Sequence, residues 1–86
     1  MATYRVLYWQ EIPSQVKAED DDGDEVNLPL PSRFIALIDR AAMERGLKGA
    51  DDYLEQWSWG EETERDGSAE EVARAVATEL EARFPA

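Results

Sequence analysis

Carboxylates are the main reactive side chains of this sequence, which has 20 Asp and Glu residues, no His and no Cys. The densest group lies between Glu19 and Glu25, around Gly23. In the register of an EF-hand loop with Gly23 at the sixth position, Ala18 falls at the first position and Pro29 at the twelfth, where oxygen-donating side chains are needed. The run is therefore predicted to be the solvated tip of a β-hairpin, with weak, nonspecific Ca²⁺ or Mg²⁺ association as the alternative.

The absence of His and Cys removes most catalytic chemistry. Without imidazole or thiolate, the chain has no means of forming a structural zinc site, a disulfide, a redox thiol or a Cys or His nucleophile. It has no Gly-rich phosphate loop and no Gly-x-Ser-x-Gly motif, and the stretch from Gly46 to Gly49 is typical of a helix terminus. Among twenty carboxylates a suitably spaced acid pair is always present, so such a pair indicates nothing. The sequence predicts no catalytic residue, no metal ligand and no cofactor, and it favours a non-enzymatic role without deciding it.

Aromatic residues provide the other candidate for a functional site. Tyr8 and Trp9 come from one segment, Tyr53, Trp57 and Trp59 come from another, and so small a domain cannot bury all five in one core. The simpler interpretation is that Tyr53 and Trp57 pack on a sheet and that Trp9 covers its edge. The alternative is a partly exposed interaction surface, because Trp and Arg dominate the binding energy of many interfaces. The candidate binding surface consists of Arg5, Tyr8, Trp9, Gln10, Glu11, Tyr53, Trp57 and Trp59.

Three strands are predicted in the first third of the chain. Residues 3–11 are rich in β-branched and aromatic side chains and have no polar face, which predicts a central strand covered on both sides. Residues 15–20 and 25–30 alternate polar and apolar side chains, as half-exposed strands do. Pro29 and Pro31 cannot donate main-chain hydrogen bonds, so the third strand is expected at an edge of the sheet.

Three helices are predicted to follow, over residues 33–45, 51–59 and 69–83. Ser32 is expected to cap the first helix, and Gly46 is expected to end it. Ser68 and Glu71 have the spacing of a capping box at the start of the last helix, after a polar connector over residues 61–67. Strands followed by helices predict an α+β fold, with a small antiparallel sheet of about three strands covered by three helices.

Length and charge limit the class of protein further. At 86 residues the chain is predicted to form a single domain over residues 1–86. Its net charge is −11, of which residues 1–30 and 61–86 carry −5 each and residues 31–60 carry −1. Such a charge repels phosphate backbones and anionic lipids, so no nucleic acid and no membrane is expected as a partner. The sequence has no basic, apolar leader and no apolar run of membrane-spanning length, which predicts a cytoplasmic location.

A resemblance to a known family extends over nearly the whole chain. It rests on VLYWQEIPSQV at residues 6–16, on the pairs at 33–34, 38–39 and 42–43, and on DYLEQW at residues 52–57. These motifs resemble the small bacterial domain family labelled "virulence factor". The resemblance implies a signature at Tyr8, Trp9, Glu11, Ile12, Pro13 and Ser14, with Tyr53, Leu54 and Trp57 as a second patch. It implies no catalytic residue, because the family name describes a phenotype and not a mechanism.

The leading hypothesis is a non-catalytic bacterial adaptor. It would bind another, unidentified protein through the turn at Trp9 and Glu11 and the region of Trp57 and Trp59. The near-neutral middle third, which contains these two Trp residues, repels an acidic partner least. We expect a monomer or a weak homodimer.

Two alternatives stay open. One is a small-molecule binder or an accessory subunit of a metabolic enzyme system, in which Arg5, Gln10 and Glu11 orient a ligand against an aromatic wall. For this alternative, the resemblance points to bacterial one-carbon methyl-transfer systems. The other is an acidic mimic of nucleic acid, which the net charge permits.

Overall fold

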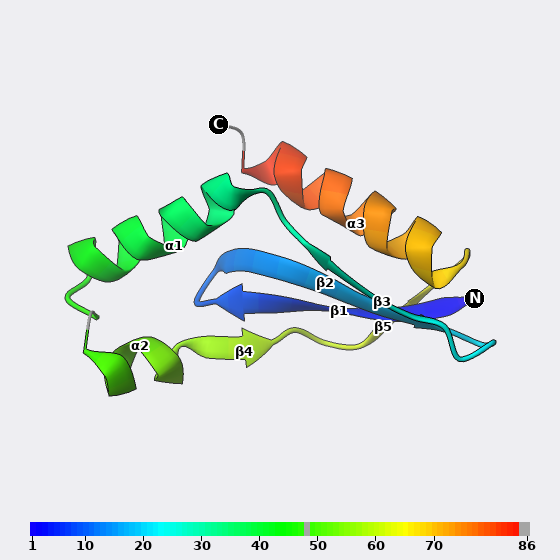
Figure 1. The fold of residues 1–86 in the computed structure, drawn as a ribbon, viewed down its shortest axis with the longest axis horizontal. Helices are drawn as coiled ribbons and strands as arrows, with labels where there is room; N and C mark the ends of the chain where they lie inside the picture. Colours follow the sequence, from blue (N-terminus) through cyan, green and yellow to red (C-terminus); the bar gives the residue numbers. More distant parts are fainter. Residues whose placement is uncertain (48, 85–86) are drawn as a thin grey trace.

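A five-stranded antiparallel sheet and three helices make up the part of the chain that the structure, a computed structural model, describes: residues 1–47 and 49–84 (Figure 1). The strands are β1 (Ala2–Trp9), β2 (Ile12–Asp20), β3 (Glu25–Pro29), β4 (Trp57–Trp59) and β5 (Thr63–Arg65). The helices are α1 (Ser32–Glu44), α2 (Ala50–Glu55) and α3 (Ala69–Arg83). The predicted α+β class is confirmed, whereas the predicted sheet of about three strands is too small.

The first three strands form two consecutive hairpins. β1 pairs with β2, and β2 pairs with β3, which lies at the edge of the sheet as its proline predicts. The register of β1 and β2 shifts between Leu7 and Tyr8, where a bulge in β2 leaves Ser14 without a partner on β1. Gly23 turns the second hairpin with a φ of 86°, a conformation that only glycine adopts without strain.

The two strands that the sequence did not predict pair with the other edge of β1. β4 places Trp59 opposite Leu7, and β5 places Glu64 opposite Thr3, so β1 is central as predicted. Residues 57–59 were expected to end a helix, and residues 61–67 were expected to be a connector. Each strand has only three residues, too few to show an alternating pattern. Their position comes from pairing with β1 and not from local propensity.

Gly60 carries the chain out of β4 at a point of close approach. Its main-chain N–H donates a hydrogen bond of 2.8 Å to the oxygen of Val6. A Cβ atom at Gly60 would lie 3.0 Å from the ring of Tyr8, so a side chain at this position would crowd that ring and force it to shift. Beyond this point the chain leaves the sheet until β5 begins.

The boundaries of α1 match the prediction at one end only. Ser32 is the first helical residue and Pro31 is the cap position, with no side-chain hydrogen bond, so the predicted Ser32 cap is wrong. At the other end, Gly46 has a φ of 69°, and the Leu47 N–H donates to the oxygen of Ala42 at 2.8 Å. This is a Schellman ending, as the glycine predicts.

The other two helices differ in how well their sequence defines them. α3 begins with the predicted capping box: the Glu71 N–H donates to the Ser68 hydroxyl, and the Ser68 N–H donates to the Glu71 carboxylate, both at 3.2 Å. α2 ends at Glu55, four residues before the predicted end. It stops there because the oxygen of Gln56 accepts the Gln10 N–H at 3.0 Å, and the chain then enters β4.

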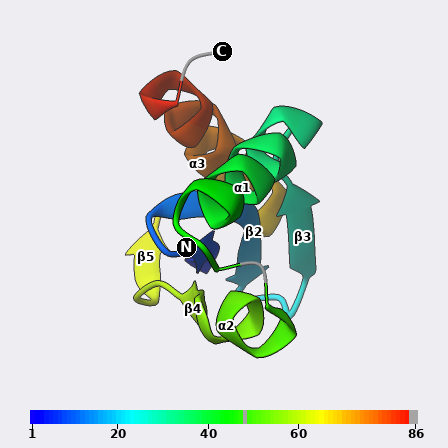
Figure 2. The same ribbon diagram turned by 90° about the vertical axis from the view of Figure 1, so that its left-hand side faces the viewer.

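α1 and α3 cover one face of the sheet, and α2 lies on the other side, at one end of the strands (Figure 2). The core between α3 and the sheet includes Val6, Val16 and Val72. At the junction of the two covering helices, the rings of Phe34 and Phe84 meet edge to face, with centroids 5.9 Å apart. The second face of the sheet therefore has a helix over part of its length only.

Candidate binding surface

Alternation along β1 assigns its side chains to the two faces of the sheet. Tyr4, Val6 and Tyr8 face α3, where they line a small hollow with Val76 and Leu80. Thr3, Arg5, Leu7 and Trp9 consequently face the other way. On that side α2 covers the Trp9 end, and the rest of the face has no described helix above it.

Trp9 lies beneath α2 and is fully buried, with a relative exposure of 0%. Its indole N–H donates a hydrogen bond of 3.0 Å to the main-chain oxygen of Tyr53, and the two rings lie 5.6 Å apart. Trp57 is opposite Trp9 in the sheet, and its ring meets that of Tyr53 edge to face at 6.1 Å. Burial raises the pKa of the Tyr53 phenol, and the charge of Asp39 raises it further. The expectation that Trp9 belongs to an exposed surface, or covers an edge, is wrong.

Gln10 and Glu11 form the turn between β1 and β2 and are held by the ends of two helices. Arg45, just after α1, makes a 2.7 Å ion pair with Glu11 and donates a hydrogen bond to the Gln10 side chain. The Gln10 amide donates in turn to the Gln56 side chain at 3.0 Å. These contacts occupy the polar groups of the turn, which lies beyond the end of β1, at least about 13 Å from Arg5.

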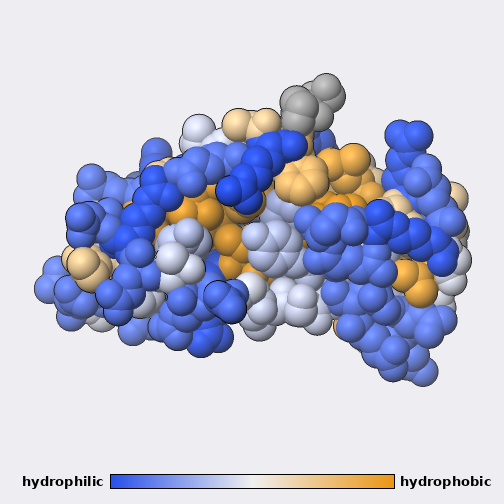
Figure 3. Space-filling model, turned by 180° about the vertical axis from the view of Figure 1, so that it is seen from behind, coloured by the Kyte–Doolittle hydropathy of each residue, from blue (hydrophilic) through white to orange (hydrophobic). Residues whose placement is uncertain are grey.

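Tyr8 lies on the opposite face from Arg5 and Trp59. It is half-buried between β1 and α3, with Tyr4 and Val6 beside it. Seen from behind, the molecule has apolar surface gathered along its middle, between more hydrophilic ends (Figure 3). The eight candidate residues thus lie in four places: in or beneath α2, at the β1–β2 turn, on the face of the sheet towards α3, and on the open part of the other face.

The open part of the second face has its side chains in three cross-strand rows. The row nearest α2 contains Gln15, Leu7 and Trp59, the next contains Lys17 and Arg5, and the last contains Glu19, Thr3 and Glu64. We call these eight residues the open-face surface. Arg5 and Trp59 are the two residues of the predicted surface that belong to it.

Trp59 is the large aromatic group of the open-face surface. Its relative exposure is 45%, although it lies opposite Leu7 in the middle of the paired region. Arg5 and Lys17 are direct cross-strand neighbours, an arrangement of like charges that destabilises a sheet. Each cation has a carboxylate beside it: Arg5 pairs with Glu62 at 3.1 Å, and Lys17 pairs with Glu25 at 3.3 Å.

Two hollows meet on the open-face surface. One, of about 250 Å³, is lined by Arg5, Lys17, Trp59 and Glu62, and also by Thr3 and Glu19. The other, of about 220 Å³, is lined by Thr3 and Glu19 together with Asp21 and Glu64. Because Thr3 and Glu19 line both, the hollows lie side by side along the first half of β1, and we call the two together the groove.

Sequence reasoning missed most of this surface. Leu7, Lys17 and Glu19 occupy alternate positions of two predicted strands, so extending the period-two pattern across the hairpin would have found them. The predicted bounds of these strands, 3–11 and 15–20, are wrong at the turn between them, because the observed strands cover residues 2–9 and 12–20. Glu62 and Glu64 depend on β4 and β5, for which the sequence has no such signal.

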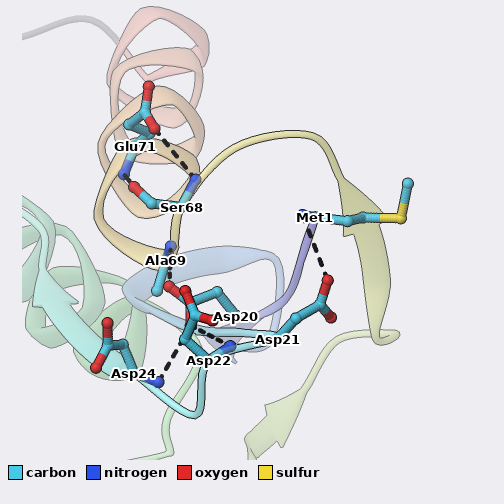
Figure 4. Close-up of polar contacts among 8 residues, drawn as sticks. All are labelled: Met1, Asp20, Asp21, Asp22, Asp24, Ser68, Ala69 and Glu71. Atoms are coloured by element: carbon cyan, nitrogen blue, oxygen red, sulfur yellow. Dashed lines mark hydrogen bonds and ion pairs between the residues drawn. The ribbon is translucent and has the colours of Figure 1, made fainter.

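Asp20 has a structural role at the far end of the groove (Figure 4). One carboxylate oxygen accepts the N–H groups of Asp22 and Asp24 at 3.0 and 3.1 Å, and the other accepts the Ala69 N–H at 3.2 Å. The Ala69 hydrogen bond, followed by those from Asp24 and Asp22, lowers the pKa of the Asp20 carboxyl below its ordinary value, while partial burial opposes this shift. Asp21, Asp22 and Asp24 are exposed, so the predicted solvated hairpin tip is confirmed for them.

Within residues 1–47 and 49–84, no group of three or more Asp or Glu side chains is arranged to hold a metal ion. No described helix is long and apolar enough to cross a bilayer.

These observations define a small α+β domain with an open sheet face. A family model described as "Virulence factor" matches residues 7–86, and the chain therefore belongs to the virulence factor family. This confirms the resemblance seen in the sequence. No curated protein and no solved structure matches the chain.

Proposed function

We propose that this chain is a non-catalytic protein-interaction domain that binds another protein through the open-face surface. The observation that carries the proposal is the exposure of Trp59 on a sheet face, beside Arg5 and Leu7. Trp and Arg are the residue types that most often dominate interface energies, and an apolar centre with a polar rim is the usual plan of an interface.

The charges of the surface support the same role. Placing Arg5 directly opposite Lys17 costs stability in the isolated domain, and nothing in the core requires it. The ion pairs of both residues are exposed and therefore weak, so they add little to the stability of the isolated domain. A pair of cations that costs stability is more easily explained by binding than by folding.

The two alternative functions have less support. The small-molecule hypothesis needs Arg5, Gln10 and Glu11 to converge, but the last two are held at the turn by Arg45. The nucleic-acid mimic needs a continuous acidic stripe, and Lys17 and Arg5 interrupt the acidic residues on this face.

Photo-crosslinking in native cells tests the proposal. We would replace Trp59 by a benzophenone amino acid and, as a matched control, replace Ile35, a similarly exposed apolar residue on α1. A discrete protein adduct at position 59 that is absent at position 35, and that Arg5→Ala weakens, is the expected result. Identical adducts at both positions, adducts to nucleic acid, or no protein adduct would contradict protein binding at this face.

A further inference from the structure

The groove on the open-face surface has two chemically different ends. One end has the aromatic side chain of Trp59, which lies opposite Leu7 in the sheet. The other has Glu19 and Glu64, which lie on either side of Thr3 on the neighbouring strands. Both carboxylates are exposed, and neither makes an ion pair with any residue that the structure describes.

We infer that the groove binds an extended segment of a basic partner protein, with a Lys or Arg side chain at Glu19 and Glu64 and an apolar side chain at Trp59. This inference rests on the proposed function and adds the chemistry of the partner to it. The partner is defined by a charge and an apolar group at a fixed separation.

The separation follows from the geometry of β1. Thr3 and Leu7 are four residues apart in one strand, so the two ends of the groove lie about 13 Å apart. An extended peptide that runs along the strand covers this distance between residues i and i+4, whose side chains point to the same side. A single extended segment can therefore contact both ends of the groove at once.

The sign of the partner's charge follows from the charges on this face. Lys17 and Arg5 already form ion pairs with carboxylates. The two glutamates at the acidic end, by contrast, form no ion pair with a cation among the described residues. The whole chain carries −11, which attracts a basic segment over a distance and repels an acidic one. The same charge opposes a second copy of this chain as the occupant, because two copies repel each other.

Selection from a displayed library of random nonapeptides on the purified, full-length chain tests the inference. We expect enriched sequences to contain Lys or Arg four positions from an aromatic or aliphatic residue. A selected peptide should bind about tenfold more weakly to the Glu19→Gln/Glu64→Gln variant, and more weakly as salt is raised. The variant Asp51→Asn/Glu55→Gln changes the net charge equally on α2 and should bind like the wild type.

Several outcomes would overturn the inference. These are an acidic consensus, no preferred charge, equal binding by the two double variants, or no enriched peptide at all. Failure of this inference is distinguishable from failure of the proposed function. If the protein adduct at position 59 still forms in the Glu19→Gln/Glu64→Gln variant, the chain binds a protein through this face, but the inferred basic segment is wrong.

Discussion

The indole N–H of Trp9 donates a hydrogen bond of 3.0 Å to the main-chain oxygen of Tyr53, which is 44 residues away in the sequence. The contact joins the central strand to α2 and closes one end of the second sheet face. It also divides the three Trp residues by role. Trp9 is a core residue, Trp57 lies at the margin of the core, and Trp59 is exposed on the open-face surface.

Replacing Trp9 and replacing Trp59 should therefore have opposite effects. Trp9→Ala should lower the free energy of unfolding by about 3–5 kcal/mol, because it leaves a cavity and removes the indole hydrogen bond to the Tyr53 oxygen. Trp59→Ala should change it by less than about 1 kcal/mol and abolish partner binding. Urea unfolding followed by circular dichroism measures both. Since Trp9→Ala risks unfolding so small a domain, Trp9→Phe, with a smaller loss, is the second variant. Equal losses in the free energy of unfolding for substitutions at positions 9 and 59 would show that Trp59 is a core residue.

Asp20 should make the stability of the protein depend on pH in the acid range. Its pKa is lowered in the folded state, so its contribution is present above the unfolded value of 3.8 and is lost as pH falls through the folded pKa. We expect the urea midpoint of the wild type to fall more steeply below about pH 4 than that of Asp20→Asn. Parallel curves for the two proteins would show that the carboxylate contributes no more than the amide.

The two serines at the starts of helices should respond differently to the same substitution. Ser68→Ala should lower the free energy of unfolding by about 1 kcal/mol, because it removes the acceptor of the Glu71 N–H. Ser32→Ala should leave stability nearly unchanged, since Ser32 makes no capping hydrogen bond. Thermal or urea unfolding separates the two cases. A comparable loss for Ser32→Ala would indicate a cap that the structure does not contain.

Gly60 should be sensitive to the smallest possible side chain. Gly60→Ala places a methyl group 3.0 Å from the Tyr8 ring and should cost about 1–3 kcal/mol, the usual cost of overpacking. It should also displace β4 and weaken binding at Trp59. Gly49→Ala is the control, because its nearest contact is the Asp52 side chain at 3.4 Å. Wild-type stability of Gly60→Ala would mean that β4 moves away from β1 without cost.

The sequence predicted the elements that local chemistry defines. The capping box at Ser68, the glycine ending at Gly46 and the edge position of β3 are each determined by a few neighbouring residues, and all three are confirmed. The predicted end of α2 was wrong because Gln10, which is distant in sequence, forms the hydrogen bonds that stop the helix. Local propensity does not carry such information.

The candidate surface was predicted only in part, for a related reason. Arg5 and Trp59 lie together on the open face, but Trp9, Tyr8 and Gln10 go elsewhere because of the face that each occupies and the element that covers it. The face of Tyr8 follows from alternation alone. Burial of Trp9 depends on α2 returning to the central strand, which only the fold reveals.

The pairing of β1 also determines the order in which the sheet is completed. β1, β2 and β3 are consecutive hairpin partners, whereas β4 and β5 reach β1 only after two intervening helices. Long-range pairing carries the larger loop-closure cost, so we expect the outer strands to form last and to open first, with the fastest amide exchange of the sheet. Trp59 and Glu64 belong to these strands. Local opening at this edge would dismantle the proposed binding groove while the core between the hairpins and α3 stays folded.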